Sequence, residues 1–273
     1  MSDFKFISAD EVRAAVRGEY AQVATAVEGA ACAPGCCAPR PALSLELGYS
    51  LADIEGLPEG ANMGLGCGNP QVIAALRPGE TVLDLGAGGG FDSFLAWRQV
   101  GSAGRVIGVD MTPEMVSKAR ANAKELGAAN VDFRLGEIEH LPVADGIVDV
   151  ILSNCVINLS PDKPAVFREA FRVLKGGGRL AISDVVATAP IPEHLATRVD
   201  FLTGCVAGAA LVSDLEDMMR AAGFENVMVI AKPESREVIA GWFPDSGAED
   251  YVASANLIAT KPGGDRGCGS GCC

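Results

Sequence analysis

From Thr81 onward the sequence alternates short apolar runs with amphipathic segments of helical length. TVLDL is followed by FDSFLAWRQV, RVIGVD by PEMVSKARANAKEL, and the same order continues as far as RLAISDVV. Apolar strands separated by helices are typical of a parallel sheet with helices on both faces. Two later runs, NVMVIA and SANLIAT, bring the expected strands to seven. The sequence therefore predicts an α/β fold with a doubly wound, mostly parallel seven-stranded sheet.

Residues at the ends of the expected helices agree with this pattern. Thr112 can cap a helix that has Pro113 at its first position, and Gly127 lies just beyond its last turn. Gly176 to Gly178 predict that a later helix ends at Lys175. Proline at the start and glycine at the end of a helix are the expected asymmetry, so these segments are predicted to be separate helices.

The balance of charge excludes two classes of partner. The formal net charge is −13, whereas nucleic acids and anionic membrane surfaces are bound mainly through basic side chains, so we expect neither. No stretch approaches the roughly 20 apolar residues that span a bilayer. The N-terminus, MSDFKFISADEVRAAVRGEY, lacks a basic region followed by an apolar run. The expected location is the cytoplasm.

A glycine-rich turn follows the first strand of the sheet. In VLDLGAGGGFD, Asp84 ends the strand, and Gly86, Gly88 and Gly90 lie in the turn before a helix. Glycines there let the backbone approach a ligand at the point where open α/β sheets bind nucleotides. A dinucleotide fingerprint needs glycine where this chain has Phe91, and no Lys-Ser/Thr pair cradles a phosphate. The pattern favours a nucleotide-like ligand without phosphate.

Acidic residues also follow the next two strands. Asp110 ends the second strand, where a carboxylate can accept hydrogen bonds from ribose hydroxyls, and Glu137 follows the third in GEIEHL. Together with the glycine turn, these acids resemble the class I S-adenosylmethionine-dependent methyltransferases, which have a Rossmann-like fold, over residues 70–260. The resemblance implies that Asp84 and Gly86 face the methionine part of S-adenosylmethionine and Asp110 its ribose.

The same resemblance places the adenine between two apolar side chains. Met111 and Ile138 would cover its faces, and Glu137 would face its edge. Packing in the core is the alternative role for Met111 and Ile138.

Nine cysteines are many for a chain in a reducing compartment and point to metal, metalloid or redox chemistry. Six form two C-x-x-x-C-C clusters, namely Cys32, Cys36 and Cys37 in CAPGCC and Cys268, Cys272 and Cys273 in CGSGCC. Cys67 lies in the loop GLGCGNP, Cys155 follows the strand VDVIL, and Cys205 lies beyond the fifth strand. Each alone is more often a small buried hydrophobe, but as a set these three favour binding of a soft ligand.

The acceptor of the methyl group is expected to be soft as well. Hydroxyl and amide acceptors need a base or a polar clamp, but the chain has only His140 and His194 and lacks an N-P-P-Y tetrapeptide. His140 is expected at the surface. Trivalent arsenic held by three thiolates would keep a lone pair for the methyl group, and no proton would have to leave the nucleophile. Arsenous acid is also uncharged, which suits an acidic protein.

Several motifs resemble the bacterial arsenite methyltransferases between about Tyr20 and Lys261. They are GYS, PEGANMGLGCGNP, DLGAGGGFD, GVDMTPEM, SNCVINLSPDK, and SDVV followed by GCVAGA. The resemblance implies that Cys67, Cys155 and Cys205 bind arsenic and that a further redox cysteine lies in the first cluster, where we assign it to Cys37. It also implies stepwise conversion of arsenite to methylated arsenicals, with S-adenosylmethionine as cofactor and a thiol reductant such as glutathione or thioredoxin.

An amphipathic helix is expected within residues 9–28, where apolar residues recur at helical spacing. The chain is predicted to have four parts: residues 1–70, an N-terminal helix and Cys/Gly-rich loop segment covering the active site; 71–190, the S-adenosylmethionine-binding core; 191–262, substrate-side helices and closing strands; and 263–273, a flexible Cys-rich tail. The tail could chelate arsenic, hand it to the active site, or have no essential role.

Two other functions compete with this hypothesis. One is a class I methyltransferase of a quinone or another small organic acceptor, with incidental cysteines; it predicts activity that survives Cys155→Ser. The other is a non-enzymatic thiol-based protein that binds metalloids through the cysteine clusters, whose spacing does not match the common paired zinc motifs. It predicts thiol-dependent binding without turnover.

Overall fold

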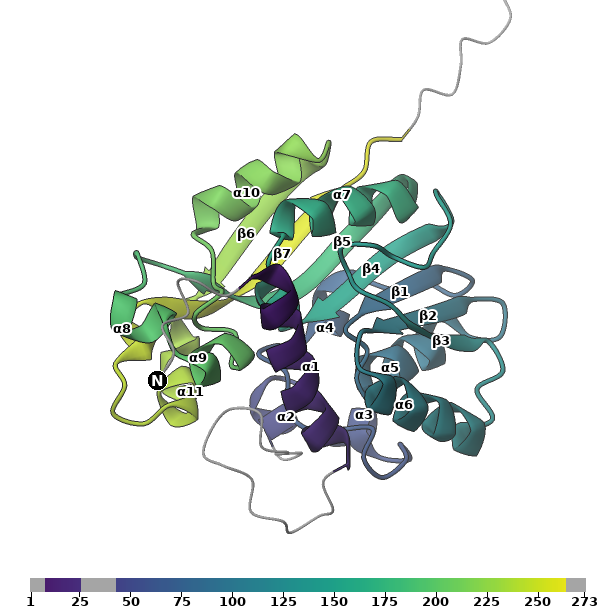
Figure 1. Ribbon diagram of the computed structural model, residues 1–273. Coiled ribbons are helices and arrows are strands. Elements are labelled where there is room, and N and C mark those ends of the chain that lie inside the picture. Colours follow the sequence, from purple (N-terminus) through teal and green to yellow (C-terminus); the bar gives the residue numbers. More distant parts are fainter. Residues whose placement is uncertain (1–7, 26–42, 264–273) are drawn as a thin grey trace, which may run out of the picture.

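A single seven-stranded sheet organises residues 8–25 and 43–263, the part of the chain described by this computed structural model (Figure 1). The strands are β1 (Thr81–Leu85), β2 (Arg105–Asp110), β3 (Val131–Leu135), β4 (Val148–Asn154), β5 (Leu174–Ala187), β6 (Glu225–Lys232) and β7 (Val252–Thr260). Their order is β3-β2-β1-β4-β5-β7-β6. All pairs from β3 to β5 are parallel, and β7 runs antiparallel to both β5 and β6. The predicted fold is confirmed.

Helices cover both faces of the sheet. They are α1 (Ala9–Thr25), α2 (Leu43–Glu46), α3 (Leu51–Ile54), α4 (Pro70–Ala74), α5 (Phe91–Val100), α6 (Pro113–Leu126), α7 (Lys163–Val173), α8 (Glu193–Ala196), α9 (Val199–Thr203), α10 (Val212–Ala221) and α11 (Arg236–Trp242), with short 3-10 turns η2 (Ile157–Leu159), η3 (Pro233–Ser235) and η4 (Ala248–Asp250). Leu83 packs with Phe167 of α7 and Met219 of α10, whereas Val82 packs with Ala74 and Ala96 of α4 and α5. Neighbouring strand residues point to opposite faces, so the apolar run of β1 serves two cores.

One of the predicted helix ends differs from the structure. Gly127 ends α6 in the left-handed conformation, as predicted, and Thr112 precedes its first turn, although the Thr112 side chain makes no capping hydrogen bond. The prediction that a helix ends at Lys175 is wrong. The helix α7 ends at Val173, because the fully buried Leu174 already pairs with Val148 as the first residue of β5.

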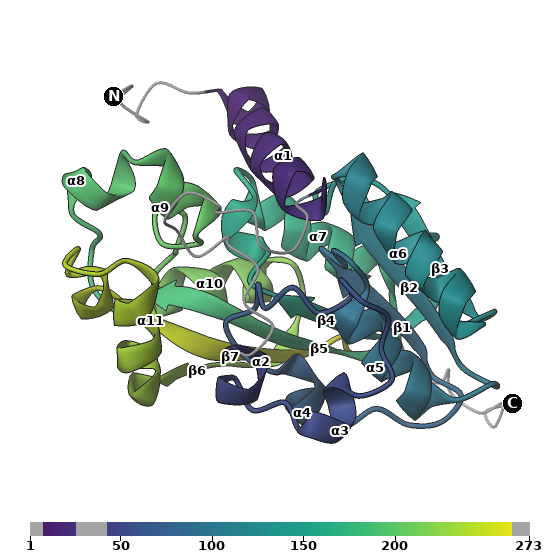
Figure 2. The same cartoon turned by 90° about the horizontal axis from the view of Figure 1, so that it is seen from below.

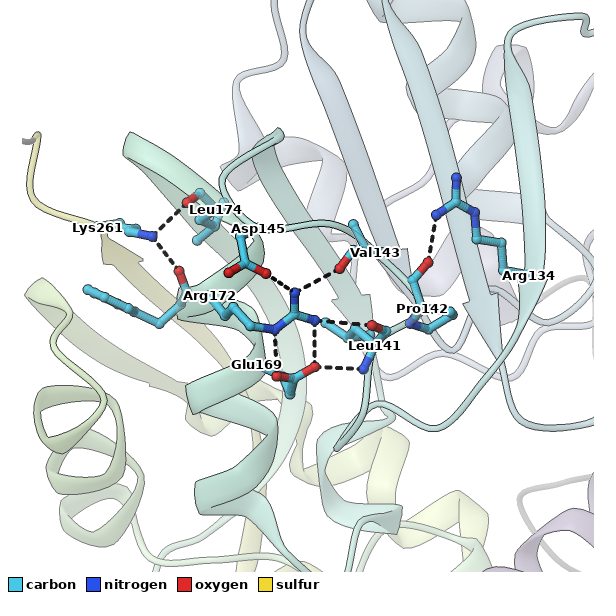
Figure 3. A network of polar contacts seen from close by, with 10 residues as sticks. Arg134, Leu141, Pro142, Val143, Asp145, Glu169, Arg172, Leu174 and Lys261 are labelled. Carbon is cyan, nitrogen blue, oxygen red and sulfur yellow. Dashed lines mark hydrogen bonds and ion pairs between the residues drawn. The ribbon is translucent and has the colours of Figure 1, made fainter.

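A network around Arg172 holds the loop between β3 and β4 (Figure 3). The guanidinium donates to the carbonyl oxygens of Leu141 and Val143 at 3.1 and 2.8 Å and pairs with Glu169 at 2.7 Å. Glu169 also accepts the backbone N–H of Leu141 at 2.8 Å. This loop also carries Ile138, so the network holds that residue in position.

The N-terminal helix lies outside the sheet, against α6 and α9 (Figure 2). It occupies most of the range 9–28 predicted to be helical and buries Val16. None of the helices in the described ranges is long and apolar enough to cross a membrane. The predicted boundaries at residues 70, 190 and 262 stay predictions. Cys37, the rest of CAPGCC and the tail CGSGCC lie outside the described residues.

Candidate active site

A cavity of about 1090 Å³, here called the central cavity, lies at the glycine turn after β1. Its walls include six of the residues predicted to bind the cofactor, which are Asp84, Gly86, Gly88, Asp110, Met111 and Ile138. Gly90 and Glu137 are not among the lining residues, whereas the buried Glu139 is. Arg13 of α1 pairs with Glu137 and Glu139 at 3.5 and 3.2 Å. The N-terminal helix is thereby tied to the edge of the cavity.

The turn itself requires glycine. Gly86 and Gly88 have φ angles of +68° and +51°, a region that favours glycine. A Cβ atom on Gly86 would lie 2.3 Å from the Val156 side chain, and one on Gly89 would lie 2.6 Å from the carbonyl oxygen of Gly60. The chain can pass this closely only without side chains, as the sequence indicated.

Asp110 holds the turn in place. Its carboxylate accepts the backbone N–H groups of Gly88 at 3.0 Å and of Thr112 at 2.8 Å. Burial raises the pKa of Asp110, and these two hydrogen bonds oppose that rise. Each carboxylate oxygen has a second lone pair, so Asp110 can also accept hydrogen bonds from a ligand.

Two more buried acids line the central cavity. Asp84 accepts a hydrogen bond from Ser93 Oγ at 2.6 Å, and Asp92 accepts one from the Tyr49 hydroxyl at 2.8 Å and one from Gln71 Nε2 at 3.1 Å. Burial raises the pKa of Asp84 well above its usual range and also raises the pKa of Asp92. These acids make the wall suitable for a cationic ligand.

Asn154, at the end of β4, connects this acidic wall to the loop that carries Cys67. Its Nδ2 donates to Asp92 at 3.2 Å, to the Tyr49 hydroxyl at 3.0 Å and to the carbonyl oxygen of Gly68 at 2.9 Å. Its Oδ1 accepts the backbone N–H of Cys67 at 3.0 Å. Sequence reasoning missed Tyr49, Asp92 and Asn154, although GYS, GGGFD and SNC were among the motifs singled out.

The structure brings the three predicted cysteines together. Cys67 and Cys155 form a disulfide with their Cα atoms 5.8 Å apart, and the Cys205 Sγ donates to the carbonyl oxygen of Cys155 at 3.0 Å. All three are buried in one cluster of side chains. The sulfur atoms of Cys67 and Cys155 and a carboxylate oxygen of Asp184 lie within 4.8 Å of one another. The disulfide was not expected from the sequence.

Two of these cysteines have an unusual backbone conformation. Cys155 and Cys205 have φ angles of +58° and +63°, which are uncommon for residues other than glycine and persist only where the surroundings enforce them. Asn158 Nδ2 donates to the Cys205 carbonyl oxygen at 3.2 Å and to Asp184 at 3.0 Å. Burial raises the pKa of Asp184 to about 6. Asn158 and Asp184 therefore hold the turn of Cys205 against β5.

A second cavity of about 320 Å³, here called the cysteine cavity, has Cys155 and Cys205 in its wall. Tyr20, Leu65, Gly66 and Cys155 line this cavity and the central cavity alike. Neither histidine of the chain lines either cavity, and His140 is exposed as expected. A ligand on the Cys155 sulfur would therefore lie at a wall shared with the proposed cofactor residues.

Comparison with known proteins gives a consistent assignment. The methyltransferase domain family matches residues 76–223. The arsenite methyltransferase of Halobacterium salinarum is 52% identical over 94% of this chain and 68% of its own length. That of Aquipseudomonas alcaligenes is 45% identical over 60% of this chain and 49% of its own length, so this chain spans about half of that relative.

A solved structure extends the likeness to the fold. The crystal structure of an arsenic(III) S-adenosylmethionine methyltransferase from Chlamydomonas reinhardtii is 31% identical, with a TM-score of 0.59, over 83% of this chain and 76% of that one. The resemblance seen in the sequence motifs is confirmed. The identity along nearly the whole chain, the shared sheet and the gathered cysteines show that this chain belongs to the arsenite methyltransferase family.

Proposed function

We propose that this protein transfers methyl groups from S-adenosylmethionine to trivalent arsenic bound by Cys67, Cys155 and Cys205. The observation that carries the proposal is the position of Cys155, which lies in the wall of both cavities. A soft substrate on its sulfur would face the residues that suit the cofactor. Positioning of this kind supplies much of the rate of a transfer reaction.

The lining of the central cavity fits S-adenosylmethionine in its chemistry. Met111 and Ile138 offer apolar surface for the adenine, and Asp110 offers a carboxylate for the ribose. Asp84 and Asp92 are buried acids, and their ionised forms would be stabilised by the cationic methionine end. When bound, S-adenosylmethionine supplies an electrophilic methyl group on its sulfonium. A role for Glu137 at the adenine edge and for Gly90 in the turn stays a prediction.

Arsenous acid would be loaded by exchange of its hydroxyl groups. Each cysteine thiol forms a sulfur–arsenic bond and passes its proton to the hydroxyl that leaves, so three thiols release three waters. Arsenic keeps its lone pair opposite the three sulfurs. The substrate is uncharged until it is captured, so the formal charge of −13 does not repel it.

The disulfide between Cys67 and Cys155 has to be reduced before arsenic can bind. A thiol reductant such as glutathione or thioredoxin would supply two electrons and two protons and end as a disulfide itself. Cys37 is our choice for a further cysteine in this redox cycle. The products would be methylated arsenicals, and a reducing cytoplasm without nucleic-acid or membrane partners would suit this chemistry.

Incubation of reduced protein with arsenite, a thiol and methyl-labelled S-adenosylmethionine tests the proposal directly. Separation of the arsenicals should show labelled product above the control without enzyme. Cys155→Ser and Cys205→Ser should each abolish it, because two thiolates cannot complete the pyramid. Cys272→Ser, in the C-terminal tail, is the matched control and should keep the wild-type rate.

Each competing function predicts a different result in this assay. Methylation of an organic acceptor that survives Cys155→Ser would identify a small-molecule methyltransferase with incidental cysteines. Tight thiol-dependent binding of arsenite without any labelled product would identify a metalloid-binding protein.

A further inference from the structure

Trp242, the last residue of α11, carries a buried donor that the described residues leave unsatisfied. Its side chain is 7% exposed, and its Nε1 has no hydrogen-bond partner among the described residues. The other tryptophan, Trp97, donates from Nε1 to Asn130 at 2.6 Å. Buried indole N–H groups normally find an acceptor, because an unmade hydrogen bond in a low-dielectric interior is costly.

The cysteine cavity is the place where an acceptor can be supplied. Trp242 lines this cavity together with Cys155 and Cys205. Trp242 also belongs to a cluster of buried, mostly apolar side chains, in which members such as Phe201 and Ile239 have no side-chain acceptor. A molecule in the cysteine cavity with an oxygen atom within hydrogen-bond distance of Trp242 Nε1 would satisfy the indole N–H.

We infer that Trp242 donates a hydrogen bond to the hydroxyl that remains on arsenic after Cys155 and Cys205 have captured it. The inference rests on the proposed function and deepens it. Exchange of two hydroxyls of arsenous acid with these two thiols forms two sulfur–arsenic bonds, releases two waters and leaves one hydroxyl on arsenic. Cys67 is not in the wall of the cysteine cavity.

The adduct in which arsenic is bonded to Cys155 and Cys205 but not yet to Cys67 is here called the half-loaded state. Trp242 is therefore a substrate-binding residue of this state. It holds the arsenic hydroxyl until the Cys67 thiol replaces it, with release of the third water. The oxygen accepts a hydrogen bond and no proton leaves the indole, which is a donor only.

This role predicts that Trp242 affects the binding of two arsenicals at the same site differently. Methylarsonous acid has only two hydroxyls, so its adduct with Cys155 and Cys205 carries a methyl group and no oxygen. The indole N–H can strengthen binding of arsenite in the half-loaded state but has nothing to bind in the methylated adduct. Trp242 therefore favours capture of arsenite over capture of the singly methylated arsenical.

The test isolates the half-loaded state in the full-length chain. Every protein compared carries Cys67→Ser, which keeps the last hydroxyl on arsenic and prevents the disulfide. The six cysteines of the terminal clusters are also changed to serine, so that arsenic binds at Cys155 and Cys205 alone. Equilibrium dialysis of reduced protein without S-adenosylmethionine, followed by quantification of arsenic, gives dissociation constants for arsenite and methylarsonous acid.

Trp242→Phe should weaken arsenite binding about three- to tenfold, the effect of one net hydrogen bond, and leave methylarsonous acid binding unchanged. Trp97→Phe is the matched control and should change neither constant. Thermal unfolding establishes that both variants are folded. Unchanged arsenite binding in Trp242→Phe, or an equal loss for both arsenicals, would overturn this inference alone. Absence of arsenite binding in the parent protein would also overturn this inference, whereas the proposed function is tested separately by the methylation assay on the protein with all three cysteines.

Discussion

Asn154 accepts a hydrogen bond from the backbone N–H of Cys67 at 3.0 Å, although the two residues are 87 positions apart in the sequence. The same side chain donates to Asp92 in the wall of the central cavity. A Cβ atom on Gly66 would lie 2.6 Å from the Asn154 side chain, so the cysteine loop packs directly on it. One residue at the end of β4 thus sets the position of Cys67 relative to the proposed cofactor site.

Asn154→Ala should release the loop that carries Cys67. The substitution removes the partner of the Cys67 N–H and of the Gly68 carbonyl, and each such loss costs about 1–3 kcal/mol where the group stays buried. Alkylation of Cys67 in the reduced protein should be about tenfold faster, since 1.4 kcal/mol corresponds to a factor of ten. Mass spectrometry of the modified peptide measures the rate. An unchanged rate would show that other contacts hold the loop.

Asp110→Ala should weaken the binding of S-adenosylmethionine by roughly 1–3 kcal/mol, because a charged acceptor and the anchor of the Gly88 N–H are lost together. Titration calorimetry gives the dissociation constant. Asp132→Ala is a suitable control, because Asp132 lies on β3, its side chain is 44% exposed and it does not line the central cavity. Equal affinities for Asp110→Ala and the wild type would exclude the assignment to the ribose.

The buried acids predict a pH dependence of stability and of cofactor binding. Burial raises the pKa of Asp84 and Asp92 above the ordinary value of 3.8, so the folded protein prefers their neutral forms. Their contribution to stability is therefore complete below pH 3.8 and is lost as the pH rises through the raised pKa values. A cationic ligand prefers the ionised forms, so its affinity should increase as the pH rises.

Comparison of S-adenosylmethionine with S-adenosylhomocysteine tests whether charge causes the pH dependence of cofactor binding. S-adenosylhomocysteine lacks the sulfonium charge, so its dissociation constant should vary less with pH than that of S-adenosylmethionine. Asp84→Asn should flatten the dependence for S-adenosylmethionine. Parallel pH profiles for the two ligands would count against an electrostatic role of this wall.

Gly208→Ala should destabilise the turn that presents Cys205. A Cβ atom on Gly208 would lie 2.1 Å from the carbonyl oxygen of Asn158, which the backbone must move to avoid, at a cost of about 1–3 kcal/mol. Gly18→Ala should have the opposite effect, because a Cβ atom there meets nothing within 4 Å. Alanine favours the helix α1 more than glycine does, so the free energy of unfolding should rise by about 1 kcal/mol. Urea unfolding measures both, and arsenite methylation should fall only in Gly208→Ala.

Much of the fold follows from local patterns in the sequence. Apolar runs between amphipathic segments determine seven strands and their covering helices, because burial on both faces requires such runs. The glycine turn and the acids Asp84 and Asp110 could be placed at one edge of the sheet, since parallel strands end there together. Residue type and motif were enough to select Cys67, Cys155 and Cys205 as a set.

The tertiary structure alone decided how these parts meet. The course of the loop after β3 decides that Glu139, and not Glu137, lines the central cavity. The pairing of Leu174 with β4 decides where α7 ends. The Asn154 network, the disulfide and the burial of the Trp242 indole arise from contacts between residues far apart in the chain. Local preferences of the backbone do not encode such contacts, because they form only when the elements pack.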